Sequence, residues 1–328
     1  MNFIKHKLYA LFFWRTPIGE ILNKFYDLKI HFKYSFKNKG NTDKEKLEAY
    51  LQKQFHVIEK GMALPNPRPG FGQEKIADIV VNAKQYLKKH GANTLTDSLV
   101  TTLKEYVAFN ELNKVDLTTD FFKNLRSFIA ANNATNDTGG TKKVTQDEIA
   151  DAIAIDYSKF VKNRYSIRDF SDKDVPESHV NEAVSIAKYA PSVCNRQGWF
   201  AHLYTDKKKV KELLSLQNGN RGFTDSINKL IIITGDTKSF TKYESNQIFV
   251  DGGLFAMSLI FALHAKEIGS IALNTDIPYV VEKKMRKAGE IAEQERIIMM
   301  LGVGFLKDEF RVAKSQRKSN KKILTIHK

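Results

Sequence analysis

The sequence predicts an α+β fold, in which a sheet flanked by helices follows an N-terminal helical region. Apolar residues recur at helical spacing through residues 43–133, whereas stretches typical of strands occur in the second half of the chain. Between these parts lies Asn132–Thr141, a polar segment with paired glycines and no periodicity. We therefore expect an accessory helical region of unknown role over residues 1–140 and a second domain over residues 141–328.

Length and composition limit the class of protein. The 328 residues exceed one typical domain, and a hydrophobic content of 42% is enough for an ordinary core. The net charge of +15 favours an anionic partner, such as a phosphate-bearing cofactor, nucleic acid or an acidic membrane face. The single cysteine excludes an intramolecular disulfide and fits a cytoplasmic protein. No apolar run reaches the roughly 18 residues of a membrane span, so we expect none.

The N-terminal residues 1–40 are aromatic and basic, and only Glu20 and Asp27 oppose their cations. The apolar run Leu8–Trp14 is too short to cross a bilayer, and no small-residue cleavage site follows it. Such a segment can lie on an anionic membrane surface. It can equally form a helix that packs on its own domain or on a partner subunit. Both interpretations stay open, and the packed helix is preferred.

Residues 43–133 predict several helices. His56, Glu59 and Arg68 flank a turn-rich loop at Leu64–Gly72 and suggest a polar site, although such clusters more often tie a loop to its helices. Gly91 is a helix stop, and threonines are candidate caps for the last two helices. The expected helices lie near Leu47–Ile58, Ile76–Leu87, Thr96–Leu112 and Thr118–Asn133.

The second part alternates helices and strands. A helix that begins at Pro176 must end at Ala190, because Pro191 disfavours the helical conformation in the residue before it. The paired glycines Gly252-Gly253 suggest a close backbone approach to a ring system, a second subunit or another helix. The other expected elements are helices near Gln146–Lys162, Lys207–Leu216, Tyr243–Lys266 and Val280–Ala292, strands at Trp199–Tyr204, Leu230–Thr234 and Arg296–Phe305, and a strand-like segment at Lys322–His327 suited to a sheet edge.

Two polar motifs flank the helix that begins at Pro176. Arg164, Ser166 and Arg168 are spaced two apart, so an extended backbone points all three side chains to the same side. Two guanidinium groups with a hydroxyl between them suit a phosphate, although a solvated edge strand explains the same spacing. The second motif, Pro191–Gly198, is a tight loop that can aim amides and backbone N–H groups at a flat polar ring.

These motifs, Arg-Tyr-Ser-Ile-Arg-Asp-Phe and Ala-Pro-Ser-Val-Cys-Asn-Arg-Gln-Gly-Trp, together resemble the FMN-dependent nitroreductase family. Members usually read Arg-Arg-Ser-x-Arg-x-Phe and Ala-Pro-Ser-x-x-Asn-x-Gln-Pro-Trp. Tyr165 and Gly198 depart from these patterns without removing a group that the family uses on the flavin. The resemblance covers about residues 150–317 and implies a nitroreductase-like sheet flanked by helices. It also implies a homodimer with FMN sites at the subunit interface.

The resemblance implies a set of FMN-binding residues drawn from both motifs, from a glycine-containing turn within Glu267–Thr275 and from the basic tail Arg311–Arg317. It names no catalytic residue, although a cation near the ring would stabilise reduced flavin, and Arg168 and Lys314 are the first candidates. We expect the motifs to converge on one phosphorylated isoalloxazine. The implied residues are Arg164, Ser166, Arg168, Pro191, Ser192, Asn195, Gln197, Gly269, Ser270, Asn274, Lys314 and Arg317.

The resemblance implies a flavin oxidoreductase. In the family's reaction NADH or NADPH delivers hydride to the flavin N5, and a small acceptor later collects the electrons. The acceptor and the choice of nicotinamide stay open. One alternative keeps FMN with another reaction, such as dehalogenation or flavin breakdown. Another is a non-enzymatic scaffold recruited to a membrane through residues 1–40.

Other chemistries lack their motifs. The histidines never pair at metal-binding spacing, and Cys194 has no cysteine partner, so we expect no metal. Cys194 as a nucleophile beside Arg196 is conceivable, but a lone cysteine is more often a small packed residue. There is no phosphate-binding Walker loop or dinucleotide fingerprint. No nucleic-acid-binding motif accompanies the basic charge, and we expect no nucleic acid partner.

Overall fold

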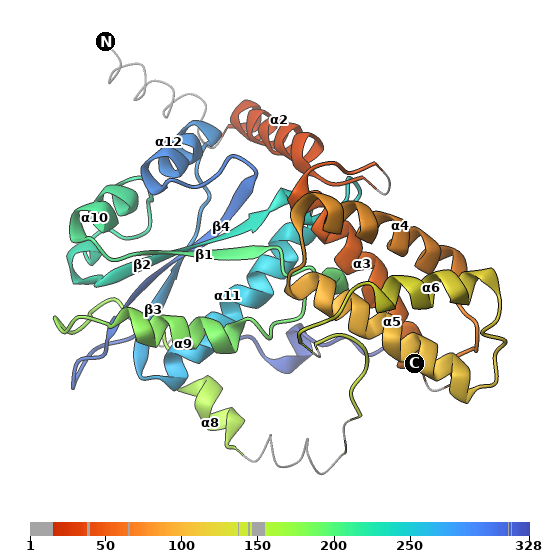
Figure 1. Ribbon diagram of the computed structural model, residues 1–328. Coiled ribbons are helices and arrows are strands. Elements are labelled where there is room, and N and C mark those ends of the chain that lie inside the picture. The colour runs from red at the N-terminus through yellow and green to blue at the C-terminus, as the bar shows by residue number, and fades with distance from the viewer. Residues whose placement is uncertain are drawn as a thin grey trace.

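A four-stranded antiparallel sheet and a bundle of helices beside it make up the described part of the chain, as Figure 1 shows. The α+β class predicted from the sequence is confirmed. The computed structural model describes residues 16–37, 40–64, 66–136, 138–143, 145, 155–313, 315 and 317–328.

The N-terminal bundle consists of helices whose ends follow local chemistry. The Asp43 carboxylate accepts a hydrogen bond from the backbone N–H of Lys46 at the start of α3, and Gly91, with a φ of 77°, ends α4. Thr96, expected as a cap, lies inside α5, because Asn93 holds the cap position and forms a capping box with Thr96. The bundle helices are α3 (Lys44–Met62), α4 (Gln73–His90), α5 (Thr94–Leu112) and α6 (Asp120–Ala130). Helix α2 (Pro17–Tyr34) precedes them and packs against the second domain.

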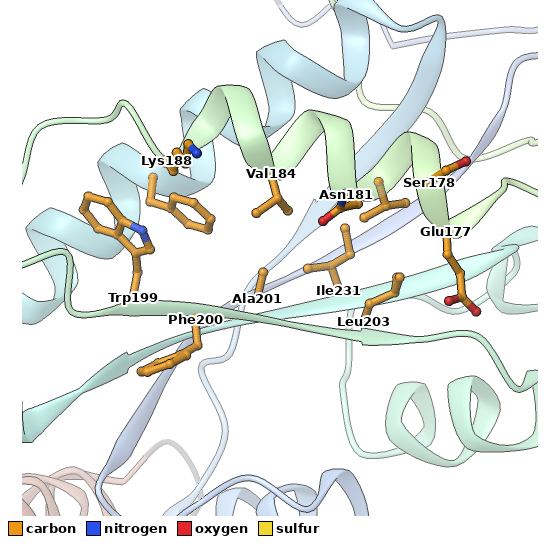
Figure 2. A pocket seen from close by; sticks show the side chains of 12 residues that line it. Glu177, Ser178, Asn181, Val184, Lys188, Trp199, Phe200, Ala201, Leu203 and Ile231 are labelled. Atoms are coloured by element: carbon orange, nitrogen blue, oxygen red, sulfur yellow. The ribbon is translucent and has the colours of Figure 1, made fainter. Parts of the chain in front are cut away.

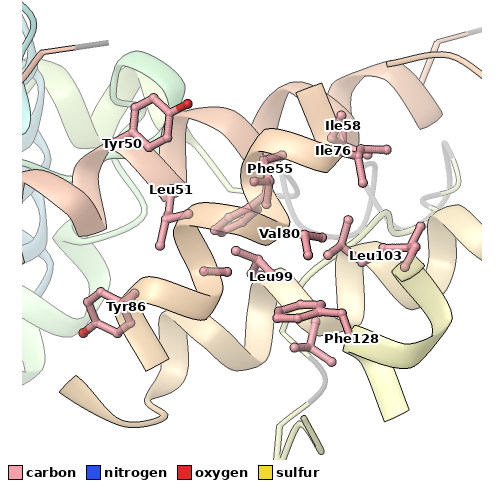
Figure 3. Close-up of a cluster of buried hydrophobic side chains, with 14 of the residues drawn as sticks. Tyr50, Leu51, Phe55, Ile58, Ile76, Val80, Tyr86, Leu99, Leu103 and Phe128 are labelled. Carbon is pink, nitrogen blue, oxygen red and sulfur yellow. The ribbon is translucent and has the colours of Figure 1, made fainter. Parts of the chain in front are cut away.

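The bundle buries a hydrophobic core of its own, shown in Figure 3. From α3, Leu51, Phe55 and Ile58 enter the same buried cluster as Val80 of α4 and Leu103 of α5. Their spacing of three and four residues is the pattern that predicted these helices. Full burial of one such side chain contributes roughly 1.5–3 kcal/mol, so this core accounts for much of what holds the helices together.

The sheet has the strand order β1-β2-β4-β3, and its neighbouring strands are antiparallel. Every residue of β2 is buried, as its apolar run predicts. The interpretation of Glu267–Thr275 as a turn is wrong for most of that segment, because it pairs with β4 as a strand. The strands are β1 (Trp199–Tyr204), β2 (Lys229–Asp236), β3 (Ile268–Leu273) and β4 (Glu295–Phe305).

Helices cover both faces of the sheet. On one face α9 and α11 pack against Ile231 and Ile233 of β2. On the other face α10 and α12 pack against Leu230 and Ile232. Alternate residues of β2 therefore point to opposite faces, as the two-residue period of a strand requires. These helices are α9 (Glu177–Ala187), α10 (Lys207–Ser215), α11 (Gln247–Ala265) and α12 (Tyr279–Gly289).

Two expected segments differ from the structure. Of the helix expected over Gln146–Lys162, the structure describes α8 (Tyr157–Lys162), and residues 146–154 lie outside the described part. The strand-like segment Lys322–His327 forms no strand and pairs with none of the strands in the described part of the chain.

Gly252 lets α11 approach the sheet closely. A Cβ atom at this position would collide with the side chain of Ile298 on β4, whereas Gly253 faces open space. The close approach expected of these glycines is therefore made to the sheet. Among the described helices α11 alone has the length and apolar composition of a membrane span, and it packs here as a core helix.

The N-terminal helical region contacts the second domain through α2, the segment that follows it and α3. The backbone N–H of Phe36 donates to the carbonyl oxygen of Phe240 at 3.0 Å. The side chain of Asn23 accepts a hydrogen bond from the backbone N–H of Tyr279, at the start of α12, at 2.9 Å. Directional polar contacts therefore join the two parts in addition to the linker.

The linker Asn132–Thr141 returns across the bundle and is tied to it. Glu59 on α3 accepts a hydrogen bond from the backbone N–H of Gly140 at 3.1 Å. The same carboxylate lies 2.9 Å from the His56 ring nitrogen. The polar cluster suggested by the sequence at His56 and Glu59 thus includes a contact that fixes the linker.

Candidate functional site

A cavity of about 540 Å³, here called the arginine cavity, receives the side chains of the first motif. Arg164, Ser166 and Arg168 all line it, whereas Ile167 between them is buried in the hydrophobic core. This alternation is what the two-residue spacing predicted for an extended backbone. The remaining lining residues are Val161, Lys162, Tyr165, Met257, Phe261, Ala313, Ser315 and Arg317.

A short pairing with β3 sets the orientation of this segment. Ser166 forms a parallel bridge with Ser270, and the backbone N–H of Ile167 donates to the Ser270 carbonyl oxygen at 3.0 Å. The motif therefore extends the sheet beside β3. Ser270 positions the motif through its backbone and is not among the residues that line the cavity.

The arginine cavity is strongly cationic. Lys162, Arg164, Arg168 and Arg317 line it, and its lining contains no acidic residue among those described. No ion pair within the described part of the chain involves Arg164 or Arg168. Guanidinium groups without a carboxylate partner suit an anion such as phosphate, because they offer planar paired donors.

One wall of the cavity is apolar and comes from α11. Met257 and Phe261 contribute that wall. A cavity that combines fixed cations with an apolar surface can take a ligand with an anionic group and a hydrophobic or aromatic part. FMN has both features, so the residues present fit this cofactor. Lys314, also expected here, lies outside the described residues.

The second motif forms a tight loop with unusual backbone geometry. Val193–Asn195 make one 3-10 turn, and Cys194, Asn195 and Gln197 have φ values of 50°, 51° and 50°. Non-glycine residues rarely adopt this left-handed region, which costs about 1–3 kcal/mol each when the surroundings enforce it. The side chains of Asn195 and Gln197 are exposed and available to a ligand.

The loop and the arginine cavity are not brought together within one chain. The Asp251 carboxylate, in the first half of α11, accepts a hydrogen bond from the backbone N–H of Val193 at 3.1 Å. Met257 and Phe261, on the cavity wall, lie six and ten positions further along the same helix, which corresponds to roughly 9 and 15 Å at 1.5 Å per residue. None of residues 191–197 lines the cavity. Within one chain the loop therefore lies outside the arginine cavity.

Gly269 and Asn274, which the sequence also predicted for the site, lie outside the arginine cavity. Gly269 on β3 packs where a Cβ atom would meet Leu306 at 2.8 Å and Ile167 at 3.0 Å, so it serves the packing beneath the motif. Asn274 follows β3, and its side-chain oxygen accepts a hydrogen bond from the backbone N–H of Asp276 at 3.1 Å. Neither residue lines the arginine cavity.

The exposed face of α11 is apolar between the loop and the cavity. Phe249, Val250, Leu254 and Met257 are all solvent-exposed there. Contiguous exposed apolar surface usually marks an interaction site. Helix α2 adds to it, because its Leu28 lines a cavity of about 200 Å³ together with Phe249.

A second large cavity, of about 620 Å³, lies between α9 and β1 and is shown in Figure 2. Val184 and Asn181 point into it from α9, opposite Ala201 and Leu203 of β1. It contains none of the residues predicted for the site. The sequence offered no signal for this cavity, because it depends on how far α9 lies from the edge strand.

A buried polar cluster lies within the sheet, and sequence reasoning missed it. The Glu295 carboxylate on β4 lies 2.6 Å from the His202 ring nitrogen and accepts a hydrogen bond from the Thr234 hydroxyl. Burial alone would raise the pKa of Glu295, but these two partners lower it below its usual value. The cluster links β1, β2 and β4. Among the described residues no group of His, Cys, Asp and Glu is placed to hold a metal ion.

Comparison with known proteins identifies relatives of this part of the chain. Residues 161–220, which include both motifs, match the model of the nitroreductase family. An Archaeoglobus fulgidus protein, provisionally named NADH dehydrogenase/NAD(P)H nitroreductase, is 24% identical over 154 residues, which are 46% of this chain and 86% of that protein.

Solved structures give similar matches. An FMN-dependent nitroreductase from Clostridium difficile R20291 is 20% identical, with a TM-score of 0.44 and coverage of 51% of this chain and 98% of that one. A nitroreductase-family protein from Streptococcus pneumoniae TIGR4 is 22% identical, with a TM-score of 0.44 and coverage of 52% and 100%. A provisionally assigned nitroreductase from Desulfovibrio desulfuricans, solved in complex with FMN, is 16% identical, with a TM-score of 0.47 and coverage of 53% and 98%.

Proposed function

We propose that this chain, whose residues 161–220 match the nitroreductase family, is an FMN-dependent oxidoreductase that passes electrons from NADH or NADPH to a small acceptor. The observation that carries the proposal is the arginine cavity, in which Arg164, Ser166, Arg168 and Arg317 share one space. The family match supplies the class of reaction. The cavity supplies a place where the phosphate of a flavin nucleotide can bind.

Each part of the cavity has a task in this proposal. Arg164 and Arg168 bind the phosphate or the polar chain of FMN through charge-assisted hydrogen bonds, which contribute about 1.5–3 kcal/mol each. Met257 and Phe261 hold the apolar part of the ligand and exclude water. The bound flavin would supply the hydride chemistry. A lining cation stabilises negative charge where it develops on the reduced ring.

We further propose that a second copy of the chain completes the site. The loop Pro191–Gln197 and the arginine cavity lie near opposite halves of α11, and the helix surface between them is exposed and apolar. A two-fold axis across α11 would place the helices antiparallel, with the loop of one copy beside the cavity of the other. The homodimer expected from the sequence would then account for the distance between the two motifs.

The direct test is spectroscopic. The purified protein is incubated with FMN, freed of unbound cofactor, and examined for flavin absorbance. It is then treated anaerobically with NADH or NADPH to see whether the bound flavin is bleached, and candidate acceptors are tested for reoxidation. Bleaching followed by recovery supports the proposal. A colourless protein that takes up no FMN would refute it, and irreversible bleaching would instead favour flavin breakdown.

A second candidate function is association with an anionic membrane through α2. The exposed side of this helix is apolar, and basic residues are interspersed along it, as in helices that lie in a membrane interface. Flotation of the full-length protein with anionic vesicles, compared with a Phe25→Glu variant, tests this idea. Loss of flotation in the variant supports it, and a wild-type protein that stays at the bottom refutes it. The exposed apolar residues of α2 are Ile18, Ile21, Leu22, Phe25, Leu28 and Phe32.

A further inference from the structure

Arg196 differs from its neighbours in the loop Pro191–Gln197, because its side chain is completely buried, with 0% exposed. Its guanidinium carbon lies 5.4 Å from the ring centroid of Phe36 and 5.4 Å from that of Phe240. An Nη atom lies 2.9 Å from the Glu244 carboxylate. The adjacent Asn195 and Gln197 are exposed.

Burial of this cation is compensated only in part by its surroundings, because its two Nη atoms are buried without a hydrogen-bond partner among the described residues. A guanidinium removed from water is costly unless it is paired. Here two aromatic rings attract it through cation–π contacts, and Glu244 supplies the opposite charge. Burial alone would raise the pKa of Glu244, but the Arg196 contact helps to lower it, which keeps the carboxylate charged.

Arg196 also closes the loop on itself. Its Nε–H donates to the carbonyl oxygen of Val193 at 3.1 Å, across the residues with left-handed backbone geometry. Such geometry persists only where other contacts enforce it. The Gln197 backbone N–H adds a hydrogen bond to the Ser192 hydroxyl at 3.0 Å. Hydrogen bonds within the loop therefore stabilise its strained backbone, and the buried Arg196 side chain makes one of them.

One of the two rings that cover Arg196 belongs to the N-terminal helical region. Phe36 is 1% exposed and is part of the same hydrophobic cluster as the bundle core. Its backbone pairs with the Phe240–Thr241 segment through a hydrogen bond and a parallel bridge. Helix α3 contacts the 3-10 turn of the loop. The loop thus rests directly on the accessory region.

We infer that Arg196 is a positioning residue through which the N-terminal helical region holds the Pro191–Gln197 loop in the conformation that presents Asn195 and Gln197. The inference rests on the proposed function only for the identity of the ligand, FMN, that the Asn195 and Gln197 side chains contact. The contacts by which Arg196 and the N-terminal helical region fix the loop conformation need no ligand. It gives the accessory region a role that the sequence did not assign.

Cys194 allows a test without flavin, because it is the only cysteine in the chain and lies in the loop. The full-length protein is labelled with N-ethylmaleimide under native conditions, and the rate is followed by intact mass. Variants Phe36→Leu and Arg196→Lys remove one ring or the planar group between the rings. Phe122→Leu is the matched control, since Phe122 is a fully buried bundle residue and is neither of the two rings that cover Arg196. Urea unfolding of each variant measures its overall stability.

We expect labelling of Cys194 to accelerate about fivefold in Phe36→Leu and in Arg196→Lys, the factor that corresponds to loss of one cation–π contact. Phe122→Leu should stay within about twofold of the wild type at a comparable loss of stability. Equal labelling rates in Phe36→Leu and Phe122→Leu, or an Arg196→Lys variant that labels like the wild type, would overturn the inference.

A second readout connects the loop to the flavin. In a protein that binds FMN, Phe36→Leu and Arg196→Lys should alter the visible circular dichroism of the bound flavin, and Phe122→Leu should not. A flavin signal that is unchanged in both loop variants counts against the role of Arg196 in the site. If the wild-type protein takes up no FMN, the proposed function fails, and the labelling rates still decide whether the bundle holds the loop.

Discussion

Ser166 pairs with Ser270 of β3 in parallel, and this pairing determines where the first motif points its arginines. With Ser166 in register, Ile167 enters the core, and Arg164 and Arg168 enter the arginine cavity. A shift by one residue would exchange the two sides of the segment. The site therefore depends on a buried apolar residue as much as on the charged ones.

Replacement of Ile167 by alanine should destabilise the protein and weaken FMN binding together. The side chain is 4% exposed, so its loss leaves a cavity that costs about 2–5 kcal/mol. A looser segment also positions the arginines less well. Urea unfolding and an FMN titration measure the two effects. Ile186→Ala, at a position that is 52% exposed, is the control and should change stability by no more than about 0.5 kcal/mol.

The proposed subunit arrangement predicts complementation between two defective variants. Arg168→Ala impairs the cavity, and Asn195→Ala impairs the loop, so each homodimer should bind FMN poorly. In a mixed dimer one site receives both defects and the other receives none. After unfolding and refolding of an equal mixture, about one site in four should regain normal FMN binding, because about half of the dimers are mixed. No recovery would contradict a site shared between subunits.

Asp236 should make the protein less stable as the pH rises from about 4 to 6. Burial raises the pKa of its carboxyl to about 6, and the nearby Lys238 only partly opposes this effect. The folded state therefore binds the proton more tightly than the unfolded state, whose pKa is near 3.8. This contribution to stability is complete below about pH 4 and is lost by about pH 6, with a total of roughly 3 kcal/mol.

The variant Asp236→Asn isolates this effect. The amide keeps the oxygen that accepts a hydrogen bond from the backbone N–H of Lys238, and it does not ionise. The difference in unfolding free energy between the wild type and the variant should fall with increasing pH over this window. A difference that stays constant from pH 4 to pH 7 would show that the Asp236 carboxyl is not perturbed.

Local spacing was enough to predict the parts of the site that depend on one segment. Arg164, Ser166 and Arg168 share a side because alternation in an extended chain is a local property. Non-local contacts were beyond the same reasoning. The segment Glu267–Thr275 was interpreted as a turn, but pairing with β4 makes most of it a strand.

The burial of Arg196 and the position of the loop outside the arginine cavity cannot be predicted from local spacing, for related reasons. A lone arginine in a polar loop is expected at the surface, and its burial here depends on Phe36, Phe240 and Glu244, which all lie far from it along the chain. The distance between the loop and the cavity follows from where each meets α11. Neither contact leaves a periodic pattern in the sequence.

The most direct test of the central claim is an equilibrium titration with FMN of the wild type, of Arg164→Ala and of Arg168→Ala. Arg126→Ala is the matched control, since Arg126 is a partly exposed arginine on α6. Loss of a charge-assisted contact should weaken FMN binding about 10- to 100-fold in the two cavity variants. The control should bind like the wild type. Equal affinities in all four proteins, or no binding by the wild type, would contradict the assignment of the arginine cavity to the flavin phosphate.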